Sequence, residues 1–250
     1  MPVVSSHGYL LFLTMNLDRR LFEGKVTSSV IYPSFFPIVP TERVINFGCG
    51  VGPQALAYKN QYAEMVGVDL NQERLQMSDI LLKEKNVERY RTICAPVEKT
   101  GEPDMSFDKA LAIDIIEHLP NPMAFLAEAM RVLKPGGKLL LTVPAMHDHY
   151  THVARLIAQM MGRTVKRLPH GHLDAHNSSF SVGGWESLIT KAGWKIVRAR
   201  ASTLWPPLHL YGVPRFWFTN PVIRTIDGFF CQLPILKRFG QAYVIVLQRP

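Results

Sequence analysis

An apolar run that ends in three closely spaced glycines constrains the fold of this chain more than any other feature. Residues 44–52 read VINFGCGVG, so a buried strand leads into a tight turn, and Pro53 can begin a helix directly afterwards. Glycines let the backbone approach a ligand closely, and a helix N-terminus offers free N–H groups to a negative group. Asp69 ends the next apolar run, 21 residues after Gly48. This order of strand, turn, helix, strand and acid indicates nucleoside binding.

The details of the turn narrow the choice of nucleoside. Pro53 occupies the position of the third glycine that a dinucleotide-binding turn requires. No Tyr is followed four residues later by Lys, and no GxxxxGK[ST] phosphate loop occurs. We therefore expect a ligand that has a ribose and a carboxylate but no phosphate groups.

Strand-like and helix-like segments alternate along most of the chain. Asn71 and Asn121 are each placed to cap a helix, residues 134–137 (KPGG) are expected to stop the second of these helices, and Gly193 to end a third. This alternation predicts an α/β fold with a mostly parallel sheet covered on both faces by helices. The predicted strands are residues 43–47, 64–69, 90–94, 107–114, 138–143, 194–201 and 242–249.

Composition favours a folded intracellular protein. Of the 250 residues, 47% are hydrophobic and 19% charged, which excludes a disordered or collagen-like chain. The three cysteines lie far apart without a CxxC pair, which is typical of a reducing compartment. The N-terminal apolar run over residues 9–15 is too short for a membrane span and lacks the flanks of a signal peptide. We expect a cytoplasmic location, with peripheral membrane contact as a further possibility.

The basic residues are concentrated in the second part of the chain. Residues 1–150 have a charge balance of −2, whereas residues 151–250 contain 13 Lys and Arg against three Asp and Glu, a balance of +10. Such asymmetry indicates an anionic partner, either a phosphorylated substrate, a membrane surface or nucleic acid. A solvated basic face without a partner would give the same pattern.

Residues 204–240 form a long insertion before the last predicted strand. The insertion contains five prolines, so we expect neither a regular helix nor a flexible linker. Its aromatic and basic residues suit a membrane interface or an acceptor with a lipid tail and an anionic head, and they would also suit RNA. A hydrophobic lid over a small-molecule pocket is the remaining alternative. The aromatic residues are Trp205, Tyr211, Phe216, Trp217, Phe218, Phe229, Phe230 and Phe239.

Three segments together resemble the class I S-adenosylmethionine-dependent methyltransferases. They read VINFGCGVG, VGVDL and FDKALAIDIIEHLPNPMAFLAEAMRVLKPGGKLLLTVP, and the resemblance covers about residues 40–200. Within that class the chain is similar to the group that contains the ubiquinone-type O-methyltransferases. The resemblance implies a Rossmann-like sheet of seven strands in the order 3-2-1-4-5-7-6, whose antiparallel last strand would be residues 242–249. It also implies a single domain over residues 1–250, with an N-terminal extension (1–40), a cofactor-binding half (41–145) and an acceptor-side half (146–250).

The same resemblance implies S-adenosylmethionine as cofactor and assigns its binding residues. The glycine loop would hold the methionine part and the ribose, Asp69 the ribose hydroxyls and Leu70 the adenine. Asn46 stands where family members carry Asp or Glu, and Ala95 where many carry Asp, so backbone from Pro96 and Val97 would have to serve the adenine. The implied cofactor-binding residues are Asn46, Gly48, Cys49, Gly50, Gly52, Asp69, Leu70, Pro96, Val97, Ala112 and Ile113.

Methyl transfer to the oxygen of a hydroxyl group with a high pKa needs a general base, and histidine is the usual one. His118 follows the fourth predicted strand, at the edge where open α/β sheets bind ligands, although it could instead cap the next helix. His172 and His176 are the other candidates, and they lie in a segment matching the family's acceptor-side loop. Six of the nine histidines fall between residues 147 and 176, but no cysteine or carboxylate pair joins them, so we expect no metal site.

The sequence therefore predicts a methyltransferase acting on oxygen of a small or lipid-linked acceptor. Alternatives are an RNA or protein methyltransferase, or an inactive methyltransferase-like partner subunit. Against RNA, the Asn/Asp-Pro-Pro-aromatic motif of many base-nitrogen methyltransferases is absent, and residues 114–117 read DIIE instead. The sequence leaves the oligomeric state open.

Overall fold

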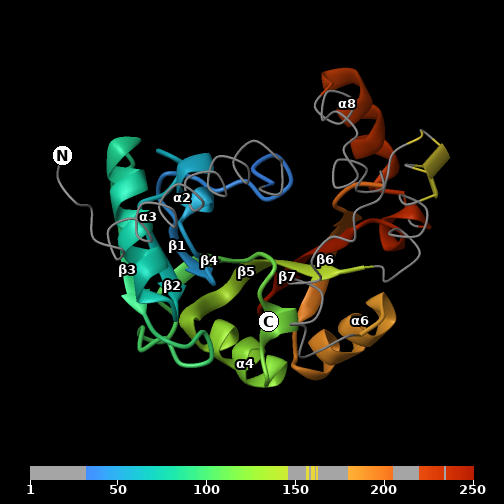
Figure 1. The fold of residues 1–250 in the computed structure, drawn as a ribbon. Helices are drawn as coiled ribbons and strands as arrows, with labels where there is room; N and C mark the ends of the chain where they lie inside the picture. The colour runs from blue at the N-terminus through green and yellow to red at the C-terminus, as the bar shows by residue number, and fades with distance from the viewer. Residues whose placement is uncertain are drawn as a thin grey trace, which may run out of the picture. The chain divides into compact units, whose positions relative to one another are not determined.

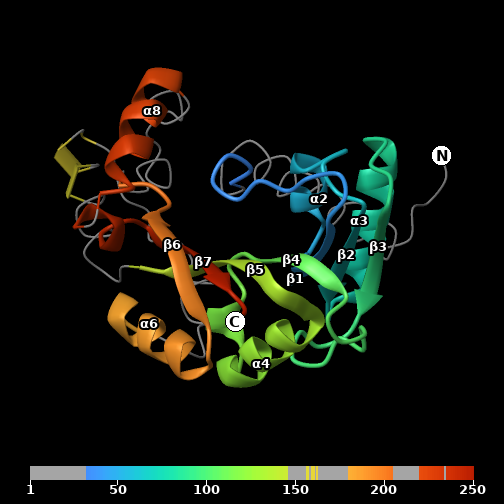
Figure 2. The same ribbon diagram turned by 180° about the vertical axis from the view of Figure 1, so that it is seen from behind.

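Seven strands form one mixed sheet in the computed structural model (Figures 1 and 2), which describes residues 32–145, 156–157, 159–160, 162, 180–204, 220–233 and 235–250. The strand order is β3-β2-β1-β4-β5-β7-β6. The strands are β1 (Arg43–Phe47), β2 (Glu64–Asp69), β3 (Tyr90–Cys94), β4 (Phe107–Ala112), β5 (Leu133–Pro144), β6 (Lys195–Ala201) and β7 (Ala242–Gln248). The helices are α2 (Pro53–Ala57), α3 (Gln72–Glu84), η1 (Ile116–His118), α4 (Pro122–Val132), α6 (Val182–Lys191), α8 (Pro221–Phe230) and η3 (Leu236–Arg238).

The strand pairing confirms the predicted topology. Strands β1, β2 and β3 pair in parallel, and β7 runs antiparallel to both β5 and β6. Four of the five residues of β1 are buried and all of β2 is buried except its two ends, as expected for central strands covered on both faces. Among the described residues, no helix combines the length and apolar character that crossing a bilayer requires.

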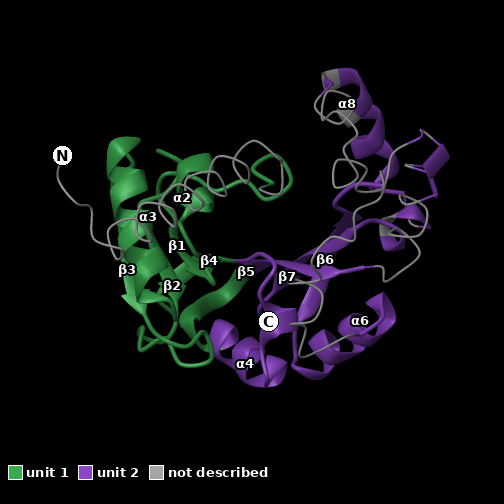
Figure 3. Cartoon of the chain, in the orientation of Figure 1, with its two compact units in different colours: residues 1–111, 131–137 green, residues 112–130, 138–250 purple. Residues whose placement is uncertain are grey.

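The contacts divide the chain into two compact units (Figure 3). Unit 1 comprises residues 1–111 and 131–137, and unit 2 comprises residues 112–130 and 138–250. The predicted division at residues 145 and 146 concerns function and stays a prediction.

The predicted helix caps are present. The Oδ1 atom of Asn71 accepts from the N–H of Arg74 at 3.0 Å, and Oδ1 of Asn121 accepts from the N–H of Ala124 at 3.1 Å. These bonds satisfy N–H groups that the first helical turn leaves unpaired. Gly193 follows α6 with φ +85°, the left-handed conformation that ends many helices.

Several predictions differ from the structure, in addition to differences of one residue at the start of β6 and the end of β7. Strand β4 ends at Ala112 rather than at residue 114, because Asp114 takes a positive φ of 54° and leaves the strand. Helix α4 ends at Val132, just before the KPGG segment as predicted, but β5 begins at Leu133 rather than at residue 138 and includes that segment. The insertion contains a regular helix, α8, because Asn220 caps it and the proline at its first position is tolerated there.

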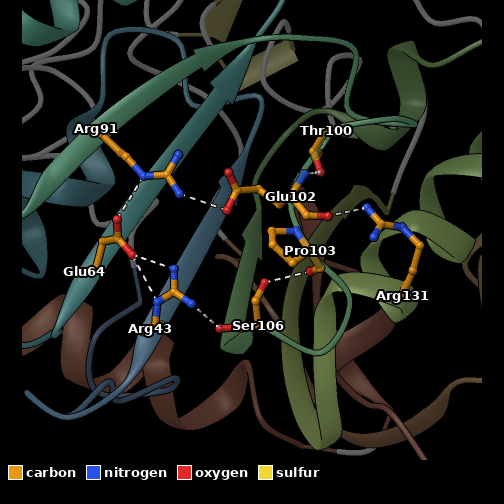
Figure 4. A network of polar contacts seen from close by, with 8 residues as sticks. All are labelled: Arg43, Glu64, Arg91, Thr100, Glu102, Pro103, Ser106 and Arg131. Carbon is orange, nitrogen blue, oxygen red and sulfur yellow. Dashed lines mark hydrogen bonds and ion pairs between the residues drawn. The ribbon is translucent and has the colours of Figure 1, made fainter.

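A network of charged side chains joins the starts of the first three strands (Figure 4). Arg43 begins β1, Glu64 begins β2 and Arg91 lies second in β3, so parallel pairing brings the three to one edge. Glu64 contacts Arg43 at 2.7 Å and Arg91 at 2.9 Å, and Arg91 also contacts the buried Glu102 at 2.9 Å. This edge lies at the opposite ends of the strands from Asp69, so we assign it to stability.

Two carboxyl groups at this edge have lowered pKa values. Partial burial raises the pKa of Glu64, but hydrogen bonds from Arg43 and Arg91 outweigh it and hold the pKa below its ordinary value of 4.5. Partial burial likewise raises the pKa of Asp108, and the contacts with Lys134 and the N–H of Arg43 bring it below 3.8. A carboxyl with a lower pKa in the folded state stabilises the fold above its ordinary pKa, and this is lost as pH falls through the folded value.

We therefore expect the free energy of unfolding to fall as pH drops below about 4.5. Glu64→Gln should lower that free energy by about 1 kcal/mol at neutral pH and should flatten its loss in acid. Denaturant titrations at neutral and acid pH measure both effects. The exposed Glu88→Gln is the control and should change neither. An acid loss in Glu64→Gln as steep as in the wild type would contradict the assignment.

Candidate cofactor site and candidate base

The loop after β1 is built by three glycines in the left-handed conformation. Gly48, Gly50 and Gly52 have φ values of 65°, 52° and 76°, which side chains other than glycine rarely adopt. Between them, the N–H of Cys49 donates to the carbonyl of Val68 at 3.0 Å, so the loop is anchored to the end of β2. The predicted glycine turn is therefore present at the carboxyl ends of the parallel strands, where open α/β sheets bind ligands.

Asp69 fastens this glycine turn to the start of α3. Its Oδ2 atom accepts from the N–H of Gly50 and its Oδ1 atom from the N–H of Asn71, each at 2.9 Å. A carboxylate has about four acceptor sites, so two hydrogen bonds leave acceptor capacity for a ligand. The half-buried carboxylate is thus held in one orientation and can still receive two hydroxyl groups. Sequence reasoning missed the bond to Asn71.

An exposed apolar residue lies next to this carboxylate. Leu70 is 69% exposed, although it directly follows the buried strand β2. The backbone of Asp69 in turn accepts from the N–H of Ala95 at 3.2 Å, which brings the segment after β3 to the same place. In that segment the side chain of Pro96 is exposed and that of Val97 is buried. Leu70 and Pro96 offer apolar surface, whereas Val97 can contribute only its backbone.

Asn46 carries an unsatisfied buried oxygen close to the glycine turn in sequence. The side chain is fully buried, and its Nδ2 atom donates to Oε1 of Gln54 at 3.2 Å. Its Oδ1 atom has no hydrogen-bond partner within the part of the chain that the structure describes. An orphaned acceptor of this kind costs about 1–3 kcal/mol. A ligand with an N–H or O–H donor would remove that cost, so the residue fits a cofactor carrying an ammonium group.

Helix α2 offers few free N–H groups for the predicted anion contact, which stays a prediction. It has only five residues and begins with Pro53, which has no N–H group. The N–H of Ala55 already donates to the carbonyl of Gly52 at 3.1 Å. The polar groups that remain for a ligand therefore come from the turn and from Asp69, which suits a nucleoside better than a phosphate.

The side chain of Tyr90 packs next to the glycine turn, and sequence reasoning missed this contact. A Cβ atom on Gly67 would lie 2.1 Å from the hydroxyl of Tyr90 and 2.8 Å from Sγ of Cys49, so the tyrosine occupies the space that the glycine leaves. The hydroxyl also accepts a hydrogen bond from Ser78 at 3.3 Å. Burial raises the pKa of the Cys49 thiol to about 12. Cys49 is therefore a protonated packing residue, and the signal for this cluster was the glycine inside strand β2.

Two candidate residues of unit 2 lie at the end of β4. Ala112 and Ile113 are buried, so only their backbone could contact a ligand. After them, the N–H of Asp114 donates to Oγ1 of Thr142 at 2.8 Å, and that hydroxyl donates back to Oδ1 of Asp114 at 2.9 Å. This reciprocal pair holds the backbone at the end of the strand in a fixed conformation.

His118 ends the short helix η1. Its side chain is about one third exposed, and its Nε2 atom lies 4.0 Å from Oε1 of the buried Glu117. Asn121 supplies the cap of α4, so the alternative role of His118 as that cap is not needed. His172 and His176 lie outside the described residues. Within the described part of the chain, no three His, Cys, Asp or Glu side chains could share a metal ion, and the histidine-rich segment lies outside that part.

The chain is similar to known methyltransferases in sequence and in fold. Residues 45–141 match a family model described as a methyltransferase domain. The ubiquinone biosynthesis O-methyltransferase of Xanthomonas oryzae pv. oryzae is 27% identical over 132 residues, which are 53% of this chain and 55% of that one. An uncharacterized methyltransferase of Bacillus subtilis is 33% identical over 148 residues, 59% of this chain and 55% of that one. Residues 45–141 carry a methyltransferase domain, and the fold is that of class I methyltransferases.

Structural comparison gives the same fold for this methyltransferase domain. A SAM dependent methyltransferase from Aquifex aeolicus superposes with a TM-score of 0.58 over 94% of this chain and 98% of that one, at 13% identity. At that identity the likeness concerns the fold alone. The chain spans about half the length of the curated relatives it matches.

Substitutions at two glycines of the turn distinguish an effect on ligand binding from an effect on packing. A Cβ on Gly50 would meet nothing within 4 Å, whereas one on Gly52 would lie 2.4 Å from Oγ of Ser78. We expect Gly50→Ala to cost about 1–2 kcal/mol of stability and to weaken S-adenosylmethionine binding roughly tenfold or more. Gly52→Ala should cost more stability, because the side chains below the turn must move.

Calorimetric titration and denaturant unfolding of both variants measure these effects. Gly101→Ala is the matched control, since Gly101 also has a positive φ of 77° and open space around it but lies outside the turn. It should lose stability like Gly50→Ala and keep full cofactor affinity. Equal affinities of Gly50→Ala and Gly101→Ala would contradict a cofactor site at the turn.

Proposed function

We propose that the protein transfers a methyl group from S-adenosylmethionine to an oxygen atom of a small or lipid-linked acceptor. The observation that carries the proposal is the carboxylate of Asp69, held by the N–H groups of Gly50 and Asn71 beside the exposed Leu70. A fixed carboxylate next to an apolar surface suits a ribose attached to an adenine. When bound, S-adenosylmethionine supplies a methyl group on a positively charged sulfur.

The residues of this chain have separate roles in the proposal. Asp69 accepts the ribose hydroxyls, Leu70 and Pro96 cover the adenine, and the backbone of Val97 lies alongside it. The glycine turn, with the backbone of Cys49, holds the ribose and the methionine part. The orphaned oxygen of Asn46 serves the ammonium group. The resemblance to the family implies the carbonyls of Ala112 and Ile113 as further candidates for that role. Residues 41–145 thus hold the cofactor and residues 146–250 bind the acceptor.

His118 is the first candidate for the base. Its imidazole is partly exposed, so an acceptor hydroxyl can reach it, and its Nε2 atom lies 4.0 Å from the carboxyl of the buried Glu117. His172 and His176 are the second and third candidates. Much of the acceleration in methyl transfer comes from alignment of the reacting atoms and from the exclusion of water. The base contributes a further part of the acceleration.

The acceptor class is supported by the relatives and by the insertion. A relative that shares 27% identity is a ubiquinone biosynthesis O-methyltransferase. The insertion over residues 204–240 is rich in aromatic residues and has four basic side chains against the single acid Asp227. Both features favour a hydroxylated acceptor with a lipid tail or an aromatic ring.

Asn46 favours one alternative, an inactive methyltransferase-like subunit. A neutral amide cannot form the charged contact to the cofactor's ammonium that Asp or Glu would form. Release of S-adenosylhomocysteine distinguishes the two, because an inactive subunit could still bind the cofactor. We expect release when a lipid extract is the acceptor. Release only with RNA or protein would overturn the oxygen proposal, and no release with any fraction would favour the inactive subunit.

A further inference from the structure

Helix α8, labelled in Figure 1, carries exposed apolar side chains. Val222, Ile226, Phe229 and Phe230 are 65%, 53%, 64% and 43% exposed. Their spacing of four, three and one residues places them on one side of an α-helix. The apolar side of a surface helix usually faces the core, so this helix has the reverse orientation.

The opposite side of α8 contacts the chain through a polar group. Asp227 is half-buried, and its Oδ1 atom accepts from the N–H of Leu204 at 3.0 Å. Gly228, on the same side, is also half-buried. A hydrogen bond to the segment after β6 therefore fixes the orientation of the helix.

Exposed apolar residues also occur in the sequence that follows the helix. Ile235 is 76% and Phe239 51% exposed, and Phe229 and Phe230 contact each other edge to face with their ring centres 5.6 Å apart. Single exposed apolar residues are common, but six large ones within residues 222–239 mark an interaction surface. We call these six residues (Val222, Ile226, Phe229, Phe230, Ile235 and Phe239) the α8 surface.

We propose that the α8 surface inserts into the interface of an anionic lipid bilayer. The proposal rests on the proposed function, because it brings the enzyme to a lipid-linked acceptor. Residues 204–240 contain four basic residues and one acid, and residues 151–250 have a charge balance of +10. An amphipathic helix in a basic segment is the arrangement of helices that lie in the plane of anionic membranes.

The charge also decides between a membrane and a second copy of the chain. A symmetric dimer through the α8 surface would bring two segments of the same positive charge together, which costs free energy. An anionic lipid surface instead attracts basic residues by about 1 kcal/mol each at low salt. Of the four basic residues in the insertion, Arg238 is already paired with Glu186 at 2.7 Å. Helix α8 has only ten residues, which suits a position in the plane of the membrane.

The test uses co-sedimentation with vesicles of phosphatidylglycerol and phosphatidylcholine. We expect the wild-type protein to bind, more strongly as the anionic fraction rises, and added salt to remove only part of the binding because apolar burial is insensitive to salt. Phe229→Ser should weaken partitioning about tenfold, and the triple variant Val222→Ser, Ile226→Ser and Phe229→Ser roughly a hundredfold. The control is Ile80→Ser with Met123→Ser, which removes two apolar side chains that are 46% and 40% exposed elsewhere. It should bind like the wild type.

Three results would overturn the proposal. They are no binding of the wild type at low salt, unchanged binding of the triple variant, and a dimer in analytical ultracentrifugation that the triple variant abolishes. S-adenosylmethionine affinity, measured in the same samples, reports on the proposed function separately, because the glycine turn and Asp69 belong to unit 1 and α8 to unit 2. Loss of vesicle binding with full cofactor affinity in the triple variant is the expected pair of results.

Discussion

Replacement of His118 by alanine is expected to lower kcat about 10²–10⁴-fold, the usual contribution of a general base, with little change in S-adenosylmethionine affinity. The acceptor hydroxyl keeps its proton when the imidazole is gone, so the oxygen is a poorer nucleophile. Release of S-adenosylhomocysteine at saturating cofactor and acceptor measures the effect. The cofactor residues that we propose in unit 1 are unchanged, and calorimetric titration should show this.

Asn121→Ala is the control for a merely structural effect near His118. It removes the cap of α4 and should cost about 1 kcal/mol of stability while leaving kcat close to that of the wild type. His172→Ala and His176→Ala test the other candidates in the same assay. Full turnover in all three histidine variants would mean that positioning alone carries the reaction or that another group is the base.

Asp69→Ala is expected to weaken S-adenosylmethionine binding by about 2–4 kcal/mol, roughly 30- to 1000-fold, the scale of losing a charged pair of hydrogen bonds. The variant loses the acceptor for the ribose hydroxyls and also the bonds that hold Gly50 and Asn71. Calorimetric titration measures the change directly.

Glu73→Ala controls for the loss of negative charge beside the same helix, since Glu73 is exposed in the first turn of α3. Its cofactor affinity should equal that of the wild type. Asp69→Asn keeps the shape of the side chain and should fall between the wild type and Asp69→Ala. Unchanged affinity in Asp69→Ala would place the nucleoside site elsewhere.

Three of the strands could be predicted to the residue because local signals agree there. Strands β1, β2 and β3 have the predicted bounds, since each is a run of apolar and β-branched residues bounded by turn residues or charges. The strand order came from the resemblance to a family. It could not be read from the runs themselves, because pairing between strands distant in sequence leaves no local pattern.

The boundaries that failed depend on contacts between distant residues. Asp114 leaves β4 through its bonds to Thr142, 28 residues further along the chain. Helix α8 was missed because prolines on either side of it suggested irregular structure, although Pro221 is tolerated at the first position after the Asn220 cap. The outward direction of its apolar side is a tertiary property that periodicity cannot predict.

In the candidate site, too, some contacts could be predicted from the sequence and others could not. The meeting of Gly50 and Asp69 follows from the order of strand, turn and strand, and the structure brings the two together. The contacts that support the turn could not be predicted from that order. Tyr90, on the neighbouring strand β3, fills the space next to Gly67, and Gln54 on α2 binds Asn46. These contacts decide how rigid the turn is, and only the folded structure shows them.

Hydrogen exchange of the backbone amides with and without S-adenosylmethionine tests the central claim most directly. We predict that saturating cofactor slows exchange in peptides covering residues 46–54 and 69–72, where we place the site at the glycine turn and Asp69. Peptides covering α8 should exchange at the same rate in both conditions. Unchanged exchange in the first two segments, or protection confined to other parts of the chain, would contradict a cofactor site at the glycine turn.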